Sequence, residues 1–300
     1  MKDARYENFF GLREKPFELV PNPDFLFLSG THKRALTYIN YGLMENVGFI
    51  LLTGEVGSGK TTLIRDFIKR HDETLTLAKV FNTRVDTEQL LSMINEDYGL
   101  DSRRKGKVQL LKDLNAFLIK EYEEGRHALL VIDEAQNLTP DVLEEVRMLS
   151  NLETDSSKLL QIVLAGQPEL QATLARAELR QLRQRISVVC HLAPLTRAEV
   201  QEYIYHRLDI AGNRRALQFT ADALDGIHRS SGGIPRLVNI ICNFLLLTAC
   251  AEKVREVNAA MVDDTVEGIG IVPFNTGSDD TAARRRALLL ALGVPASARE

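Results

Sequence analysis

The sequence predicts an α/β domain built on a parallel sheet, followed by a smaller domain made only of helices. Apolar runs of strand length, at residues 49–52, 127–132 and 159–165, alternate with stretches of helical period. This alternation is typical of parallel strands joined through helices. From Pro194 onward only helical patterns follow. A length of 300 residues is sufficient for two modest domains, each with its own core.

Composition narrows the class of protein. Hydrophobic residues make up 45% of the chain and charged residues 26%, with a net charge of −4, so overall charge gives no attraction to nucleic acid or anionic lipid. The three cysteines form no C-x-x-C pair and are expected to be reduced. The N-terminus does not resemble a signal peptide, and the apolar run 240–251 is too short to span a bilayer. We expect a cytoplasmic protein without a transmembrane segment, whose place at the inner membrane, if any, is peripheral and reached through a partner.

The predicted strand at residues 49–52 leads into a glycine-rich turn, residues 54–61, that fits the pattern G-x-x-x-x-G-K-[ST]. A strand, a glycine turn and a helix in this order direct several backbone N–H groups, and the positive end of the helix dipole, at one point. Lys60 is predicted to reach the β- and γ-phosphates, and the Thr61 hydroxyl to ligate Mg²⁺. A chance match to the pattern is the alternative. The predicted nucleotide-binding residues are Gly54, Glu55, Val56, Gly57, Ser58, Gly59, Lys60, Thr61 and Thr62.

The chain before this turn, residues 1–45, is expected to form an arm and a first helix packed on the sheet domain. Residues 6–28 are rich in aromatic residues and proline and lack a helical period, which indicates an extended segment. Thr31 is expected to cap a helix from His32 to Met44. The arm closes over a base bound at the turn, or it packs without such a role.

An acidic pair, Asp133-Glu134, follows the apolar run 127–132 directly. An apolar run that ends in carboxylates is typical of a buried parallel strand whose C-terminal end opens on a site. We expect Asp133 to hold Mg²⁺ and Glu134 to polarise an attacking water. Thr139 is expected to cap the next helix, which ends near Leu149.

The next strand, 159–165, ends at Gln167, which either contacts the γ-phosphate or attacking water, or caps the following helix. Three arginines, Arg180, Arg183 and Arg185, then precede a strand at 186–192. One of them is expected to reach the γ-phosphate bound by a neighbouring subunit. An exposed basic helix end is the alternative.

In the helical region, residues 195–270, we predict four helices. They begin near Thr196, Thr220, Pro235 and Val257. Arg236, after two glycines and a proline, is expected to extend toward the bound phosphates. The sheet domain is assigned to residues 46–194 and a flexible tail to residues 271–300. Two basic stretches, 103–107 and 284–286, are the local features that suit nucleic acid, although a solvated loop is favoured for the first.

Taken in order, these motifs resemble an AAA+ ATPase and, more narrowly, the ExeA (general secretion pathway protein A) family. The resemblance covers about residues 5–270. It rests on residues 10–17, 21–27, 54–62, 131–138, 164–170, 182–186 and 232–239.

The resemblance implies a three-layer sandwich with strand order 5-1-4-3-2 and a helical lid. It implies that Lys60 and Thr61 bind phosphate, that Asp133 and Glu134 serve Mg²⁺ and the catalytic water, and that Gln167 and Arg236 are the two sensors. Arg185 corresponds to the arginine finger, with Arg180 and Arg183 in reserve. Members of this family commonly continue into a membrane span and a peptidoglycan-binding domain, and we expect neither in residues 1–300, which weakens the expectation of a direct role at the cell wall.

The sequence therefore predicts a Mg²⁺-dependent ATPase that forms homo-oligomers with a shared site and serves an envelope export system through a protein partner. The alternative is a DNA-associated ATPase resembling the regulators that select targets for transposition. A third possibility, a nucleotide switch without turnover, is disfavoured by the presence of Glu134.

Overall fold

A computed structural model describes residues 6–71, 75–81, 83–154 and 157–270. The chain separates into two compact units. The helical unit contains, among the described residues, 6–32, 55–63 and 193–270. The sheet unit contains 33–54 and the described residues of 64–192. The glycine-rich turn thus belongs to one unit and the acidic pair to the other.

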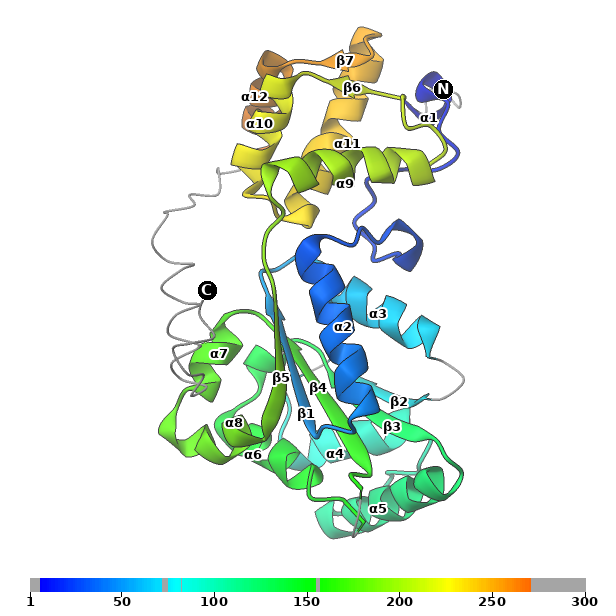
Figure 1. The fold of residues 1–300 in the computed structure, drawn as a ribbon, viewed down its shortest axis with the longest axis vertical. Coiled ribbons are helices and arrows are strands. Elements are labelled where there is room, and N and C mark those ends of the chain that lie inside the picture. The colour runs from blue at the N-terminus through cyan, green and yellow to red at the C-terminus, as the bar shows by residue number, and fades with distance from the viewer. Residues whose placement is uncertain (1–5, 72–74, 82, 155–156, 271–300) are drawn as a thin grey trace. The chain divides into compact units, whose positions relative to one another are not determined.

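The sheet unit is built on five parallel strands in the order β2-β3-β4-β1-β5, drawn side by side in Figure 1. This confirms the predicted order and the α/β class. Three strands are buried along nearly their whole length, because helices cover both faces. The strands are β1 (Phe49–Gly54), β2 (Leu75–Val80), β3 (His127–Ile132), β4 (Leu160–Gly166) and β5 (Ile186–Leu192).

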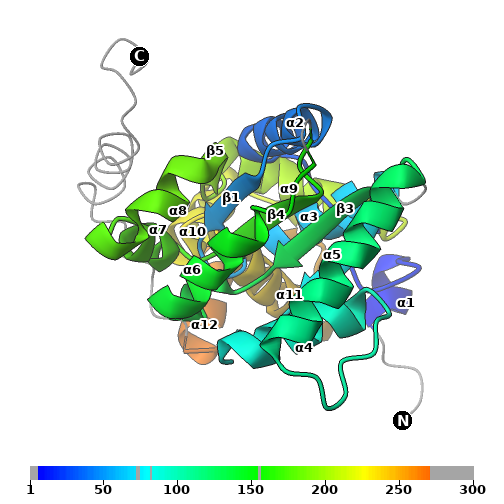
Figure 2. The same ribbon diagram turned by 90° about the horizontal axis from the view of Figure 1, so that it is seen from below.

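Helices cover the two faces of this sheet (Figures 1 and 2). On one face lies α2 (Gly30–Met44), whose Gly42 carbonyl accepts a hydrogen bond from Gln161 of β4 at 3.1 Å. α3 (Lys60–Arg70) follows the glycine-rich turn. The opposite face carries α4 (Thr87–Asp97), α5 (Lys107–Glu123) and α6 (Pro140–Leu149). Shorter elements complete the unit: η2 (Ala135–Asn137), α7 (Glu169–Leu174), η3 (Ala177–Leu179) and α8 (Arg180–Arg185).

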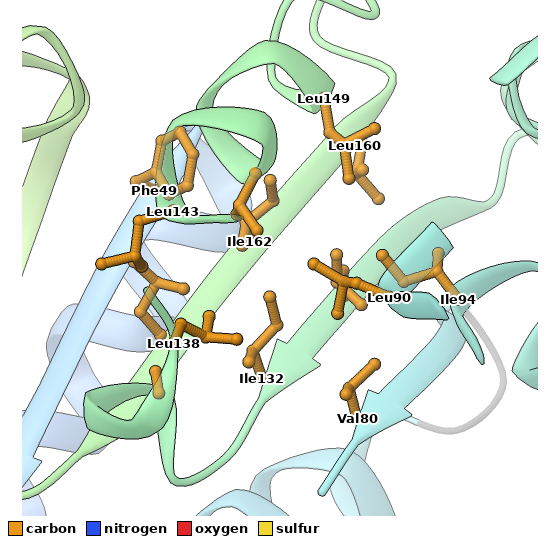
Figure 3. Close-up of a cluster of buried hydrophobic side chains, with 14 of the residues drawn as sticks. Phe49, Val80, Leu90, Ile94, Ile132, Leu138, Leu143, Leu149, Leu160 and Ile162 are labelled. Carbon is orange, nitrogen blue, oxygen red and sulfur yellow. The ribbon is translucent and has the colours of Figure 1, made fainter. Parts of the chain in front are cut away.

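The core of the sheet unit forms between the strands and the helices on this second face. Alternate strand residues point toward the helices because side chains of a strand alternate between faces. Figure 3 shows strand residues such as Ile132 and Ile162 packed with helix residues such as Leu90 and Leu143, and all four side chains are fully buried. This packing holds the sheet rigid, and with it the strand ends that carry the acidic pair.

The helical unit contains α9 (Arg197–Ile210), α10 (Ala221–Ser231), α11 (Pro235–Glu252) and α12 (Ala259–Gly268). Thr196 and Thr220 cap α9 and α10 as predicted. The expectation that only helices occur here is wrong, since β6 (Gln218–Phe219) and β7 (Glu256–Val257) pair in parallel. Each has two residues, too few to show an alternating pattern.

The N-terminal arm differs from the prediction in two respects. It is partly helical, with α1 (Tyr6–Phe10) and the 3-10 helix η1 (Pro23–Phe25). Its buried aromatic residues lie in the core of the helical unit, not on the sheet domain as expected. The aromatic content of the arm therefore indicated that it packs on a core, but it did not show which of the two units provides that core. The buried arm residues are Tyr6, Phe10, Leu12, Phe17 and Phe25.

The cap of α2 is also corrected. The helix starts at Gly30, and the hydroxyl of Ser29, not of Thr31, accepts a hydrogen bond from the backbone N–H of His32 at 3.4 Å. Helix α11 is long and apolar enough to cross a membrane by length and composition alone. Val238, Cys242 and Leu246 of this helix lie in the core of the helical unit, whereas Phe244 and Leu247 are exposed.

Candidate nucleotide site

The predicted site residues fall into two groups, one in each unit. The loop of residues 55–63 and Arg236 belong to the helical unit, whereas Asp133, Glu134, Gln167 and the three arginines belong to the sheet unit. Gly54 is the last residue of β1, so the loop leaves the sheet at the C-terminal end of a central strand.

The loop adopts a backbone shape that depends on its glycines. Gly57 and Gly59 have φ values of 82° and 98°, which residues with a side chain rarely adopt. Lys60 begins α3, a helix of 11 residues, and its ammonium donates a hydrogen bond to the Glu55 carbonyl at 3.1 Å. The loop therefore curves around its own lysine at the positive end of a helix, as a phosphate cradle requires.

Arg236 lies against this loop. Its backbone N–H donates a hydrogen bond to the Gly57 carbonyl at 3.3 Å, and a Cβ built on Gly57 would lie 2.4 Å from the Arg236 Cβ. A glycine is therefore required at position 57 for steric as well as conformational reasons. The structure brings Arg236 to the loop through its backbone and Cβ.

His32 is a loop contact that the sequence prediction missed. It is 2% exposed, and its ring nitrogens lie 2.7 Å from the Ser29 hydroxyl and 3.1 Å from the Ser58 carbonyl oxygen. Burial lowers the pKa of His32, against smaller raising effects of the Ser58 carbonyl and Glu199, so the ring is held neutral. The only signal in the sequence was a histidine at the start of a predicted helix.

The loop carries one further polar group suited to a ligand. Ser58 is 2% exposed, and its hydroxyl oxygen has no hydrogen-bond partner among the described residues. A buried hydroxyl without a partner is costly unless a ligand or water satisfies it. Together with the glycine curvature and the buried ammonium of Lys60, this hydroxyl fits a polyphosphate.

The acidic pair lies at the edge of the sheet where β1, β3 and β4 end. Thr53 pairs with Gly166, and Ile132 with Leu164, in parallel register. Gly54 therefore ends a strand close to the points where Asp133 and Gln167 follow β3 and β4. Asp133 is 4% exposed, and its Oδ1 accepts a hydrogen bond from the Glu134 N–H at 2.9 Å. No cluster of three or more His, Cys, Asp or Glu suited to a metal occurs in the described part of the chain. Mg²⁺ is commonly bound by one or two side chains together with substrate phosphates, and the buried Asp133 carboxylate at this strand end is suited to such a role.

Glu134 is held in an uncommon conformation. Its φ of 54° and ψ of 35° lie in the left-handed region, which non-glycine residues seldom occupy. The Thr83 hydroxyl donates a hydrogen bond to its carbonyl oxygen at 2.9 Å. Such backbone strain occurs mostly at functional sites, where surrounding contacts maintain it.

The carboxylate of Glu134 is bound by two glutamines. Its Oε2 accepts hydrogen bonds from the side-chain amides of Gln136 at 2.5 Å and Gln167 at 3.3 Å. The Gln167 side chain is thus directed at Glu134, and it forms no capping hydrogen bond at the start of α7. Gln136 was not identified from the sequence, because an amide two residues after an acidic pair matches no simple pattern.

The arginines lie elsewhere in the sheet unit. Arg185 donates hydrogen bonds to the Ser150 hydroxyl at 2.6 Å and the Arg147 carbonyl at 3.5 Å. Arg183 donates to the carbonyls of Leu174 and Ala175 at 3.2 and 3.0 Å. Both therefore satisfy oxygens at helix C-termini. Arg180 is exposed and makes no hydrogen bond or ion pair with the described residues.

Three of the four basic residues in the first basic stretch are paired with nearby carboxylates. Arg103, Lys105 and Lys107 form ion pairs with Asp101, Asp113 and Glu145 at 2.9, 2.7 and 2.6 Å. Ion pairing thus reduces the free positive charge of this loop, in which Arg104 is exposed. The second basic stretch, 284–286, and the tail lie outside the described residues.

Comparison with known proteins agrees with the fold. Residues 44–174 match a family described as an AAA domain. General secretion pathway protein A of Aeromonas hydrophila is 45% identical over 247 residues, which cover 82% of this chain and 45% of that protein. The chain thus spans about half the length of this curated relative.

Solved structures share the fold at low sequence identity. The Aeropyrum pernix ORC2 protein, in ADPNP–ADP complexes, has a TM-score of 0.64 at 18% identity, over 85% of this chain and 71% of that one. Thermotoga maritima RuvB, a Holliday junction branch migration motor, has a TM-score of 0.55 at 19% identity, over 97% and 88%. These similarities concern the fold alone. Residues 44–174 thus match the AAA domain family, and most of this chain is similar in sequence to general secretion pathway protein A.

Proposed function

We propose that this protein binds and hydrolyses ATP with Mg²⁺. The observation that carries the proposal is the loop of residues 55–63, in which two glycines of positive φ curve around the buried Lys60. Lys60 and the loop N–H groups would bind the phosphate oxygens, and Thr61 and Asp133 would hold Mg²⁺. The metal neutralises phosphate charge and orients the phosphates.

Glu134 would orient the attacking water and accept its proton. A carboxylate fixed by hydrogen bonds at a strand end is suited to this role, because a general base must be held within hydrogen-bond reach of the proton it accepts. Gln167 would assist in placing the water, and Arg236 would reach the phosphates with its guanidinium. The intact carboxylate favours turnover over a switch that only binds nucleotide.

We also propose that subunits associate and share the site through an arginine. The sequence favoured Arg185, but the guanidiniums of Arg185 and Arg183 are engaged with oxygens of their own subunit. Arg180 is exposed at the start of α8 and can extend toward a neighbour without breaking such contacts. Arg180 is therefore the preferred candidate.

The similarity to general secretion pathway protein A supports a role in an envelope export system. Because the chain spans less than half of that relative, the system and its partner proteins are part of the proposal. ATP turnover would drive assembly or regulation of the export machinery through a protein partner, from the cytoplasmic side of the membrane. The DNA-associated alternative gains no support from the ion-paired loop 103–107.

Steady-state phosphate release by the purified chain tests the proposed activity. Release is expected with ATP and Mg²⁺ and is expected to stop when EDTA removes the metal. A chain that binds ATP but releases no phosphate at any protein concentration would contradict the proposed hydrolysis. A rate per subunit that does not change with protein concentration would contradict the need for subunit association. Binding to duplex DNA that weakens steeply with salt would favour the alternative instead.

A further inference from the structure

A closed arrangement of three side chains surrounds the candidate catalytic carboxylate. The Gln136 amide N–H donates to Glu134 Oε2 at 2.5 Å, while the Gln136 amide oxygen accepts from the backbone N–H of Gln167 at 3.0 Å. The Gln167 side chain closes the arrangement with its own bond to Glu134 Oε2 at 3.3 Å. Gln136 therefore uses both ends of its amide, one on Glu134 and one on the backbone after β4.

We propose that Gln136 is a positioning residue that fixes the orientation of the Glu134 carboxylate and couples it to the end of β4. This inference rests on the proposed hydrolysis of ATP. Gln136 acts through Glu134 and needs no contact with the nucleotide itself.

The hydrogen-bond pattern distinguishes the two oxygens of Glu134. Both glutamine amides bind Oε2, whereas Oε1 receives no hydrogen bond from the described residues. A carboxylate held at one oxygen leaves the other for a water molecule. Gln136 thus selects Oε1 as the oxygen that accepts the proton.

The Gln136 side chain packs closely against the end of β4. A Cβ built on Gly166 would lie 2.8 Å from the Gln136 amide oxygen and 2.8 Å from Leu170 Cδ2. Gly166 is the last residue of β4. The amide of Gln136 is therefore pressed against the strand end, and a shift of Gln167 would be transmitted to Glu134 through a short chain of two hydrogen bonds.

Backbone contacts reinforce this placement from the other side. The left-handed conformation of Glu134 turns the chain so that Gln136 can return toward the carboxylate two residues earlier. Thr83 holds the Glu134 carbonyl, and the Asn137 side chain donates to the Thr83 hydroxyl at 3.4 Å. With the backbone fixed, the amide of Gln136 decides the direction of the carboxylate.

Two substitutions separate this role from a contribution to stability. Gln136→Met keeps the approximate size and removes both hydrogen bonds. Gln136→Glu keeps an acceptor for the Gln167 N–H but loses the donor to Glu134 and places a second carboxylate beside it. Gln161→Met is the matched control, since Gln161 lies near the start of β4, about 17 Å from its end at the usual strand rise.

The experiment measures kcat and KM for Mg²⁺–ATP and site-resolved amide exchange at Gln167. For Gln136→Met, kcat is expected to fall about 100-fold, as for a misplaced catalytic group, with KM little changed, and Gln167 is expected to exchange faster. For Gln136→Glu, kcat falls to a similar extent while exchange at Gln167 stays slow. Gln161→Met retains the kcat of the unmodified protein.

Several outcomes would overturn the proposal. Wild-type kcat in either Gln136 variant would show that Glu134 is positioned without it. Unchanged exchange at Gln167 in Gln136→Met would show that the bridge to β4 does not exist. If the unmodified protein binds ATP and releases no phosphate, the proposed hydrolysis fails, and the exchange measurement alone then decides whether the bridge is present.

Discussion

The backbone N–H of Arg236 donates its hydrogen bond to the carbonyl oxygen of Gly57 at 3.3 Å. Arg236 is the second residue of α11, and N–H groups in the first turn of a helix have no partner within the helix. The loop carbonyl supplies that partner. The start of α11 and the phosphate loop are thus joined by a hydrogen bond between their main chains.

The contact between Gly57 and Arg236 predicts a specific cost for a methyl group at position 57. Gly57→Ala is expected to lower the free energy of unfolding by about 1–3 kcal/mol and to weaken ATP binding, through backbone strain and a clash. Gly99→Ala is a matched control, because Gly99 has a φ of 80° but no atom within 4 Å of an added Cβ. Equal losses of stability and ATP affinity in both variants would show that the Arg236 contact is unimportant.

Lys60 is expected to provide most of the charge that binds phosphate. Lys60→Ala should weaken ATP binding about 100-fold, the usual scale for a hydrogen bond to a charged group within a site. Calorimetry with Mg²⁺–ATP measures the affinity. Lys33→Ala, which removes an exposed lysine of α2, should bind as the unmodified protein does. Retained affinity in Lys60→Ala would place the nucleotide elsewhere.

The buried His32 predicts a pH dependence of stability. Because its pKa is lowered in the folded state, the unfolded chain takes up a proton first as the pH falls below about 6.5. Stability that is fully present above this pH is therefore lost as the pH falls toward the folded-state pKa. His32→Gln should show a smaller loss of Tm between pH 7.5 and 5.5. An identical loss in both proteins would assign the effect to other groups, such as His206, whose pKa burial also lowers.

The proposed role of Arg180 can be tested by mixing subunits of two inactive variants. Arg180→Ala should bind ATP normally but hydrolyse it slowly, by a factor of about 10³ if it acts as a trans-acting arginine. Mixing it with Lys60→Ala should restore activity, because each subunit then supplies what its neighbour lacks. Arg185→Ala should instead lower the Tm, since it removes the bond to Ser150. Failure of the mixture to recover activity would contradict a shared site at Arg180.

The sheet and the loop were predictable because their signals are local. The runs that became β1, β3 and β4 are continuous and apolar, and the glycine pattern 54–61 needs only its own residues to be identified. The strand order came from the resemblance to known ATPases, since no local pattern encodes which strands pair. The caps at Thr139 and Thr196 were likewise local and were confirmed.

The errors concern contacts between distant residues. Aromatic residues of the arm could have packed on either unit, and composition does not select between them. The bridge from Gln136 to Gln167 spans 31 residues, and the contact of His32 with Ser58 spans 26. Arg185 matched the expected position in sequence, yet its guanidinium lies on the C-terminal end of α6. Such pairings depend on the tertiary fold and are not present in any short pattern.

The comparison of Glu134→Gln with the unmodified protein tests the central proposal most directly. Steady-state phosphate release and ATP affinity are measured on the same preparations. The proposal predicts that the variant binds Mg²⁺–ATP as tightly as the unmodified protein but releases phosphate about 10²–10⁴-fold more slowly, the range for loss of a general base. Release at the unmodified rate by Glu134→Gln would contradict the assignment of Glu134 as the catalytic carboxylate.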